Sequence, residues 1–300
     1  MKTNKILSTA ALLTIARIVV AQEQTQQLKQ LKITDLYVHN GFFVNSTTNG
    51  SLQDFKTLAP QSVLLKNDLS AYSQSNGYSF DGRSMLSALL GVQLRDKNKT
   101  GYRKSPLLRL GVGYYSVSGI ATNFYTTKTI TYDTLKSTKS SEVTYLDSVK
   151  RKNYNMDYSA NQLRLDASLI FRTNADARWS AFAGIGINAG ASLNSSTRIS
   201  YYETEDKEAR NTAGEHYTTN YYSSTVVNSK SEIANNKTNF TCAAYVPVGV
   251  DFRIGKKRAF WKHTHLFYEL RPSVAITAIP ELRTFADAGV QQGIGLRVTL

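Results

Sequence analysis

A strict alternation of apolar and polar side chains recurs along this chain, and the segment QLRLDASLIFR, residues 162–172, shows it most clearly. Leucine, alanine and phenylalanine occupy every second position, whereas Arg164, Asp166 and Arg172 fall on the other parity. Successive side chains of an extended strand point to opposite faces, so the segment predicts a strand with one apolar and one ionic face. What the chain can fold into depends on which face points inward.

Eight such segments occur, each long enough for a tilted membrane strand, which needs roughly 9–11 residues. They cover residues 34–44, 84–95, 106–118, 162–172, 179–193, 240–254, 264–277 and 289–300. No charged residue falls on the apolar parity of any of them. The opposite parity is rich in glycine and carries the following charged residues: Arg95, Arg109, Arg164, Asp166, Arg172, Asp251, Arg253, Glu269, Arg271 and Arg297.

Two folds accommodate this pattern. In a soluble sheet the apolar face forms the core and the arginines are solvated. Glycine weakens a strand and serves no purpose on a solvated face, whereas the inside of an eight-stranded barrel is only just wide enough for side chains. A charge facing lipid costs about 2–4 kcal/mol at the bilayer midplane, and the apolar parity avoids charge throughout. The pattern therefore favours a barrel with its leucines outward and its arginines enclosed, where glycines make room for the long arginines and their partners.

The connections between these segments alternate in length. The short ones span 96–105, 173–178 and 255–263, and the long ones span 45–83, 119–161, 194–239 and 278–288. Short periplasmic turns alternating with long external loops are typical of an up-and-down bacterial barrel, and a Greek-key sandwich does not require them. We therefore predict an all-β, antiparallel up-and-down transmembrane β-barrel of about eight strands with long extracellular hairpin loops. Ten strands remain an alternative if a loop hairpin enters the bilayer.

The beginning of the chain predicts export. Residues 1–21 combine a basic leader, a short apolar stretch and a Val-x-Ala ending, which is the pattern of a cleaved signal peptide. Residues 22–33 are then a periplasmic N-terminal segment and residues 34–300 the outer-membrane barrel. Cleavage would lower the formal net charge from +14 to +11. Export argues against nucleic acid as the partner of this basic surplus, and the single Cys242 excludes a disulfide framework within the chain.

The chain resembles the small Gram-negative outer-membrane barrels of the OmpA-like and OmpX-like type, the "outer membrane protein beta-barrel domain" family. The segments that carry the resemblance are LLGVQLR, LRLGVGYY, LRLDASLIFRTN, AFAGIGINAG, VPVGVDFRIG and GIGLRVTL. The resemblance implies a barrel in the outer membrane but no particular activity. Pro247 and Pro272 fall inside predicted strands, where each removes a ladder hydrogen bond, so we expect bulges or breaks there.

Two interpretations of the enclosed charges remain open. They form a salt-bridge network that plugs a narrow lumen, since buried charges must be paired, or they line a path for a small or hydrophobic solute. Asp35 is a possible fourth acid beside the three named above. Arginines still outnumber the acids, so some of them must lie near a mouth of the barrel or donate to carbonyl groups or water. Catalysis on lipid is the less favoured alternative, because the four histidines form no recognised motif with a nucleophile. They are His39, His216, His263 and His265.

The long loops carry the remaining expectations. They alternate and are rich in tyrosine, so they predict hairpins that continue above the membrane and offer edges for strand addition. Residues 52–72 contain a helix-like cluster after Pro60 that is expected to cap the outer mouth. We expect a non-catalytic monomer that contacts outer-membrane lipid and serves envelope structure or surface recognition and adhesion through its loops. Neither a cofactor nor a metal site is expected.

Overall fold

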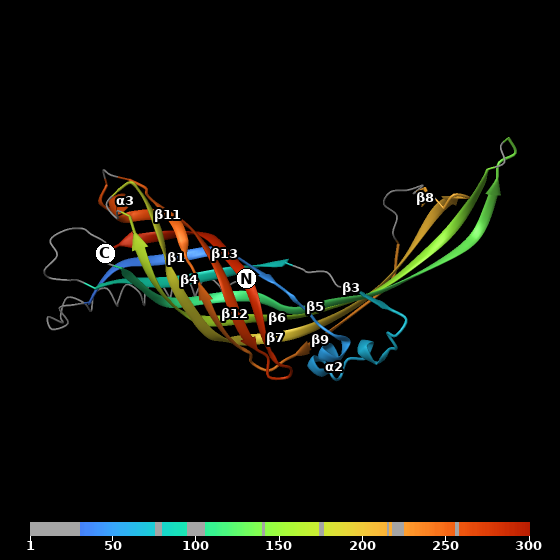
Figure 1. The fold of residues 1–300 in the computed structure, drawn as a ribbon, viewed down its shortest axis with the longest axis horizontal. Helices are drawn as coiled ribbons and strands as arrows, with labels where there is room; N and C mark the ends of the chain where they lie inside the picture. Colours follow the sequence, from blue (N-terminus) through green and yellow to red (C-terminus); the bar gives the residue numbers. More distant parts are fainter. Residues whose placement is uncertain are drawn as a thin grey trace.

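The described strands form a closed ring. The computed structural model describes residues 31–75, 80–94, 106–139, 142–173, 177–214, 216–217, 225–255 and 258–300. Within these residues, hydrogen bonding runs around eight strand positions and closes because β13 pairs with both β12 and β1 (Figure 1). The positions are β1 (Leu31–Ser46), β4 (Phe80–Leu94), β5 (Leu107–Lys136), β6 (Val143–Arg172), β7 (Trp179–Asn211), β10 (Phe240–Tyr245) with β11 (Val248–Arg253), β12 (Thr264–Ala278) and β13 (Thr284–Thr299).

The neighbours around the ring are antiparallel and follow one another in chain order, which confirms the predicted up-and-down barrel. β1 begins at Leu31, three residues before the predicted start of the barrel. The predicted signal peptide lies outside the described residues, as does the periplasmic segment up to residue 30.

The sixth strand position is interrupted at the first of the two predicted prolines. β10 ends at Tyr245 and β11 starts at Val248, which confirms the break expected at Pro247. The break expected at Pro272 is wrong, because β12 runs through it. The Val246 amide donates to the Pro272 carbonyl at 3.0 Å, so the amide that Pro272 lacks would have faced Val246, where the partner strand is already interrupted. The backbone amide hydrogens that Pro247 and Pro272 lack are therefore missing at the same place in the ring.

Three barrel strands continue past the outer rim and form a projecting sheet, which we call the arm (Figure 1). The arm consists of residues 119–136 of β5, 143–161 of β6, 194–211 of β7 and β9 (Thr225–Asn235). The short β8 (His216–Tyr217) pairs with the end of β7. The predicted continuation of the loops as hairpins is therefore correct.

One-residue bulges mark the passage from barrel to arm. The β5–β6 register shifts between Ser118 and Ile120, and the β6–β7 register shifts at Asn161 and Gln162, where Leu193 of β7 is the extra residue. Each bulge moves the inward-facing residues of its strand to the other parity. Alternation counted from the barrel therefore assigns the wrong face to the arm portion of β7 and to residues 120–131 of β5, where a second shift between Thr131 and Asp133 restores the parity.

A lid of residues 51–72 packs on the inner face of the arm where it leaves the barrel. It contains α2 (Leu52–Leu58) and the 3₁₀ turn η2 (Leu64–Lys66), and β2 (Thr48–Asn49) and β3 (Ser73–Ser75) beside it pair with β5. The α-helix precedes Pro60, and the helix-like cluster that the sequence predicted after Pro60 forms only the 3₁₀ turn η2. A capping box explains the start of the α-helix, because Ser51 Oγ accepts from the Asp54 amide at 3.1 Å and Asp54 accepts from the Ser51 amide at 2.9 Å.

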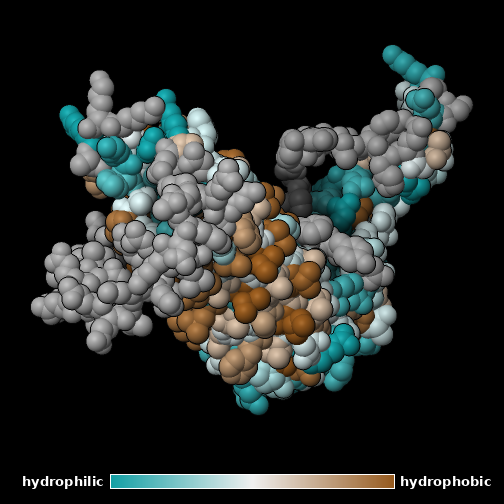
Figure 2. Space-filling view, turned by 60° about the vertical axis from the view of Figure 1, so that its left-hand side comes forward, coloured by the Kyte–Doolittle hydropathy of each residue, from teal (hydrophilic) through white to brown (hydrophobic). Residues whose placement is uncertain are grey.

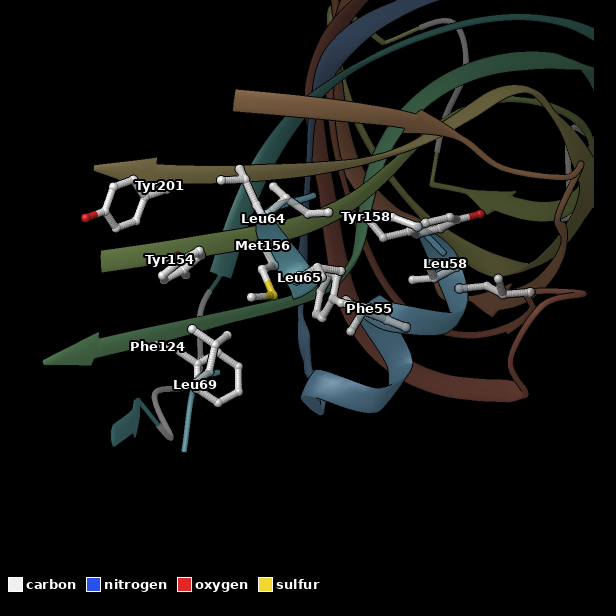
Figure 3. Packing of buried hydrophobic residues seen from close by; sticks show 14 of the residues in the cluster. Phe55, Leu58, Leu64, Leu65, Leu69, Phe124, Tyr154, Met156, Tyr158 and Tyr201 are labelled. Atoms are coloured by element: carbon white, nitrogen blue, oxygen red, sulfur yellow. The ribbon is translucent and has the colours of Figure 1, made fainter. Parts of the chain in front are cut away.

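The lid has an apolar core of its own at the barrel mouth (Figure 3). Phe55, Leu58, Leu64, Leu65 and Leu69 of the lid pack on inward-facing side chains of the surrounding strands. These partners are Ile120, Phe124, Tyr154, Met156, Tyr158, Ile199, Tyr201, Ile279 and Phe285. Since they come from β5, β6, β7 and the β12–β13 end, the cluster covers the outer mouth as expected.

The short connection between β11 and β12 contains the helix α3 (Ala259–His263). No helix among the described residues is long and apolar enough to cross a membrane.

Candidate functional site

The barrel has its apolar side chains outside and its ions inside. Leu165 is 70% exposed, Ile185 65% and Val248 47%, whereas Arg164 and Arg297 are each 2% exposed. Figure 2 shows apolar residues gathered over the barrel wall and hydrophilic ones over the projecting arm. Burying arginine while exposing leucine is unfavourable in water and favourable in lipid.

The centre of the lumen holds a chain of ion pairs with no solvent exposure. Arg109 makes a bidentate pair with Glu269, at 2.6 and 3.1 Å between guanidinium nitrogens and carboxylate oxygens. Arg271 also pairs with Glu269 and reaches Asp166 at 3.3 Å. The Tyr245 hydroxyl donates to the other Asp166 oxygen at 2.6 Å. Two arginines and two carboxylates thus neutralise one another inside the barrel, as buried charges require.

A closed ring that bears lipid-compatible side chains outside and paired ions inside decides the class of protein. This chain is a transmembrane β-barrel of the outer-membrane type. Its outward face also shows where the lipid ends on the side of the arm. On β6 the outward residues change from Leu165 and Leu163 to Ser159, Asp157 and Asn155.

A second charged cluster lies toward the short turns. Arg297 contacts Asp251 at 2.8 and 3.0 Å and Asp35 at 2.7 Å. His265 Nδ1 lies 2.6 Å from Asp251, and Arg172 approaches the same carboxylate at 3.8 Å. Asp35, which the sequence suggested as a further acid, and His265 both belong to this buried cluster.

Within the part of the chain that the structure describes, no carboxylate forms an ion pair with Arg164. Its guanidinium donates to Gln162 Oε1 at 2.8 and 2.5 Å and to Asn188 Oδ1 at 3.2 Å, and it lies over the Tyr115 ring at 4.7 Å. Gln162 in turn donates to Asn239 at 2.8 Å. Amide oxygens and an aromatic face therefore accommodate a surplus arginine next to the outer rim.

Two lumen glycines make room for aromatic rings on which arginines stack. A Cβ atom at Gly186 would lie 2.3 Å from Tyr245 Cζ, and the Arg271 guanidinium lies over that ring at 5.1 Å. The sequence predicts that glycines make room for the arginines and their partners, and at Gly186 that partner is the tyrosine between the glycine and the arginine. The same stack recurs at Gly113, Tyr115 and Arg164. A Cβ atom at Gly113 would lie 2.6 Å from the Tyr115 ring, and the Arg164 guanidinium lies 4.7 Å from the centre of that ring.

Of the ten charged residues singled out from the sequence, eight belong to the groups just described or lie beside them. Arg253 is half-buried at the end of β11, and Arg95 lies outside the described residues. Sequence reasoning missed the uncharged partners Gln162, Asn188 and Tyr245. The available signal was that these residues alternate with lipid-facing ones and therefore point inward. That signal does not show whether an inward side chain forms a hydrogen bond with an ion.

The histidines do not assemble into a catalytic arrangement among the described residues. His39 is fully buried in the lumen, and the ring of His265 contacts Asp251 and Arg297. His263 ends α3. Among the described residues no group of three or more histidine, cysteine, aspartate or glutamate side chains is arranged to hold a metal ion.

Ion pairs cross-link neighbouring strands of the arm. Arg151 of β6 pairs with Asp206 and, at 2.8 Å, with Glu208 of β7. Arg210 reaches Asp147 at 2.9 Å. On the face that continues the lipid side of the barrel, a row of cross-strand neighbours runs through Tyr125, Asn153 and Tyr202. Tyrosine and asparagine side chains on a fixed sheet are groups that recognition surfaces use.

Comparisons with known proteins leave the family open. No family model matches the chain, and no curated protein matches it. Neisserial surface protein A is 11% identical over 88% of this chain and 97% of its own, with a TM-score of 0.29. Ail of Yersinia pestis, solved with the heparin analogue sucrose octasulfate, is 9% identical over 89% of this chain and 99% of its own, with a TM-score of 0.24. The assignment of the chain to the transmembrane β-barrels rests on the geometry of the barrel itself.

Proposed function

We propose that the protein is a non-catalytic surface protein of the Gram-negative outer membrane, in which a plugged barrel anchors an arm that recognises an external ligand. The observation that carries the proposal is the fully buried chain of Arg109, Glu269, Arg271 and Asp166 across the lumen, below a sheet that projects from the rim. The charged side chains inside the barrel are thus paired with one another, whereas the exposed charged and polar side chains lie on the arm.

The plug has a direct test. Purified protein in planar bilayers is expected to give no stepwise conductance, because ions crossing the lumen would have to separate pairs held at 2.6–3.3 Å. Steps in the wild-type protein that disappear on Arg109→Ala or Arg164→Ala substitution would instead support the narrow-channel alternative.

Recognition through the arm is supported by its composition and fixed geometry. Its strands are hydrogen-bonded extensions of barrel strands, and the lid packs on its inner face, so its surface is ordered before a ligand arrives. Such preorganisation reduces the entropy lost on binding.

The test uses intact cells that display either the full protein or a variant in which residues 121–157 and 197–234 are each replaced by a short turn between neighbouring strands. Full-length protein is expected to retain cells on an array of glycans and extracellular-matrix proteins, and the shortened protein is not. Both must show heat-dependent gel mobility, which reports a folded barrel. Equal retention by both proteins would reject the arm as the recognition element.

A further inference from the structure

β9 is an edge strand of the arm. Ten of its eleven residues pair with β7, Val227 being the bulged one, and no other strand of the described chain pairs with them. An antiparallel strand directs its amide and carbonyl groups alternately to its two sides. Within the described residues, the groups of β9 that point away from β7 therefore have no partner strand, and exposed edges of this kind accept added strands.

A cavity of about 520 Å³ adjoins this edge, between the lid and the C-terminal part of β9. Leu58, Ala59 and Ile199 form its buried floor. Val63 of the lid lines it while remaining 65% exposed. Glu232 faces the lid, because its cross-strand neighbour is the buried Ile199, whereas Ile233 is the neighbour of Arg198 and directs its side chain to the opposite face. The cavity thus offers apolar surface, with one large aliphatic side chain left in water at its rim.

Hydrogen bonds fix both walls of the cavity. Asn236, directly after β9, donates to the Leu58 carbonyl at 2.7 Å. Glu232 accepts from the Ser62 hydroxyl at 2.5 Å and from the Leu64 amide at 3.3 Å. These bonds hold the lid to β9 on either side of residues 59–61, so the cavity exists before anything enters it.

The charge of the cavity is negative. Its lining consists of residues 58–63, Ile199 and residues 232–235, and among them Glu232 is the one ionisable side chain. A carboxylate with no basic residue in the same lining favours a ligand that brings a cation.

We propose that β9 and this cavity together bind an extended segment of a partner polypeptide, which adds a strand to the free edge, places a bulky aliphatic side chain in the cavity and sets a lysine or arginine beside Glu232. Only a polypeptide supplies main-chain donors and acceptors at the spacing of the edge. The proposal rests on the proposed function, because it names the kind of partner that the arm recognises.

The test uses the full protein in lipid nanodiscs and a fluorescent, end-capped peptide, TTKTLTKTT, whose leucine and lysines share one face of a strand. Three altered peptides accompany it: leucine replaced by alanine, both lysines replaced by glutamate, and alternate amides N-methylated. We expect saturable binding of the parent peptide, at least tenfold weaker binding of the first two altered peptides, and no binding of the N-methylated one.

Two protein variants locate the site. Val63→Asp is expected to weaken binding of the parent peptide at least tenfold, and Glu232→Gln is expected to abolish the preference for lysine over glutamate. Ile130→Asp is the control, since Ile130 is also an exposed aliphatic residue but lies on β5, an arm strand that has no partner on its outer side there among the described residues. Loss of binding in that control equal to the loss in Val63→Asp would overturn the proposal.

Other outcomes also decide the matter. Absence of peptide binding, or equal binding of the N-methylated peptide, rejects strand addition at β9. If arm-dependent retention of intact cells persists in that case, the proposed function stands without this site. If the peptide binds as expected while the shortened and full-length proteins retain cells equally, the site stands and recognition by the arm as a whole does not.

Discussion

Arg109 and Glu269 are 160 positions apart in the chain and meet as a bidentate ion pair at the centre of the barrel, both without solvent exposure. Arg109 comes from β5 and Glu269 from β12, and Arg271 shares the same carboxylate. Glu269 is therefore the common partner of two buried cations.

Replacing Glu269 by glutamine is expected to lower the free energy of unfolding by about 3–5 kcal/mol, because two buried guanidinium groups lose their shared anion. Urea unfolding in lipid vesicles, followed by gel mobility, measures the change. Lys150→Ala removes an exposed pair with Glu205, at 3.6 Å, and is expected to cost less than about 1 kcal/mol. Similar costs for the two variants would argue against a structural role for the lumen network.

Gly186→Val is expected to destabilise the barrel by about 1–3 kcal/mol, since its Cβ would overlap Tyr245, displace the ring and break the bond to Asp166. Gly82→Val is the matched control, because the nearest atom to a Cβ there is Val44 Cγ2 at 3.8 Å. The prediction fails if both substitutions lower the unfolding midpoint equally.

Arginine in place of Leu165 is expected to cost about 2–4 kcal/mol, because this side chain faces lipid. Ser159→Arg, on the same outward face of β6 but in the arm, is expected to cost about 1 kcal/mol or less. The difference between the two in vesicle refolding yield maps the edge of the bilayer. Equal yields would place that edge elsewhere.

Acid is expected to loosen the β6–β7 pairing of the arm before it affects the barrel. The hydrogen bond from Ser148 and the nearby Lys150 lower the pKa of Glu205, so its contribution is present above the ordinary carboxyl range and is lost as pH falls through the lowered pKa. Hydrogen exchange of the arm amides between pH 6 and 3, converted to intrinsic rates, measures this loss. Ser148→Ala should shift it to higher pH, and an unchanged profile would contradict the assignment.

The sequence predicts the barrel well because one physical rule, alternation against lipid, acts on every strand. It predicts positions less well where a local feature intervenes. The bulges at Gly119 and Leu193 change which alternate residues of β5 and β7 face inward. The Ser51 capping box starts the α-helix before Pro60.

Contacts across the lumen follow no sequence rule. That Tyr245 lies between Gly186 and Arg271 depends on the stagger of strands around the ring, which a strand-by-strand reading does not give. The sequence does not predict the cavity at β9 for the same reason, since its walls come from segments about 170 positions apart.

The lumen pairs also constrain how the protein is assembled. Arg109 lies on β5 and Glu269 on β12, which are not neighbours in the ring, so their pair forms only when the ring brings these two strands to face each other. Closure of the barrel and neutralisation of its central charge are consequently coupled.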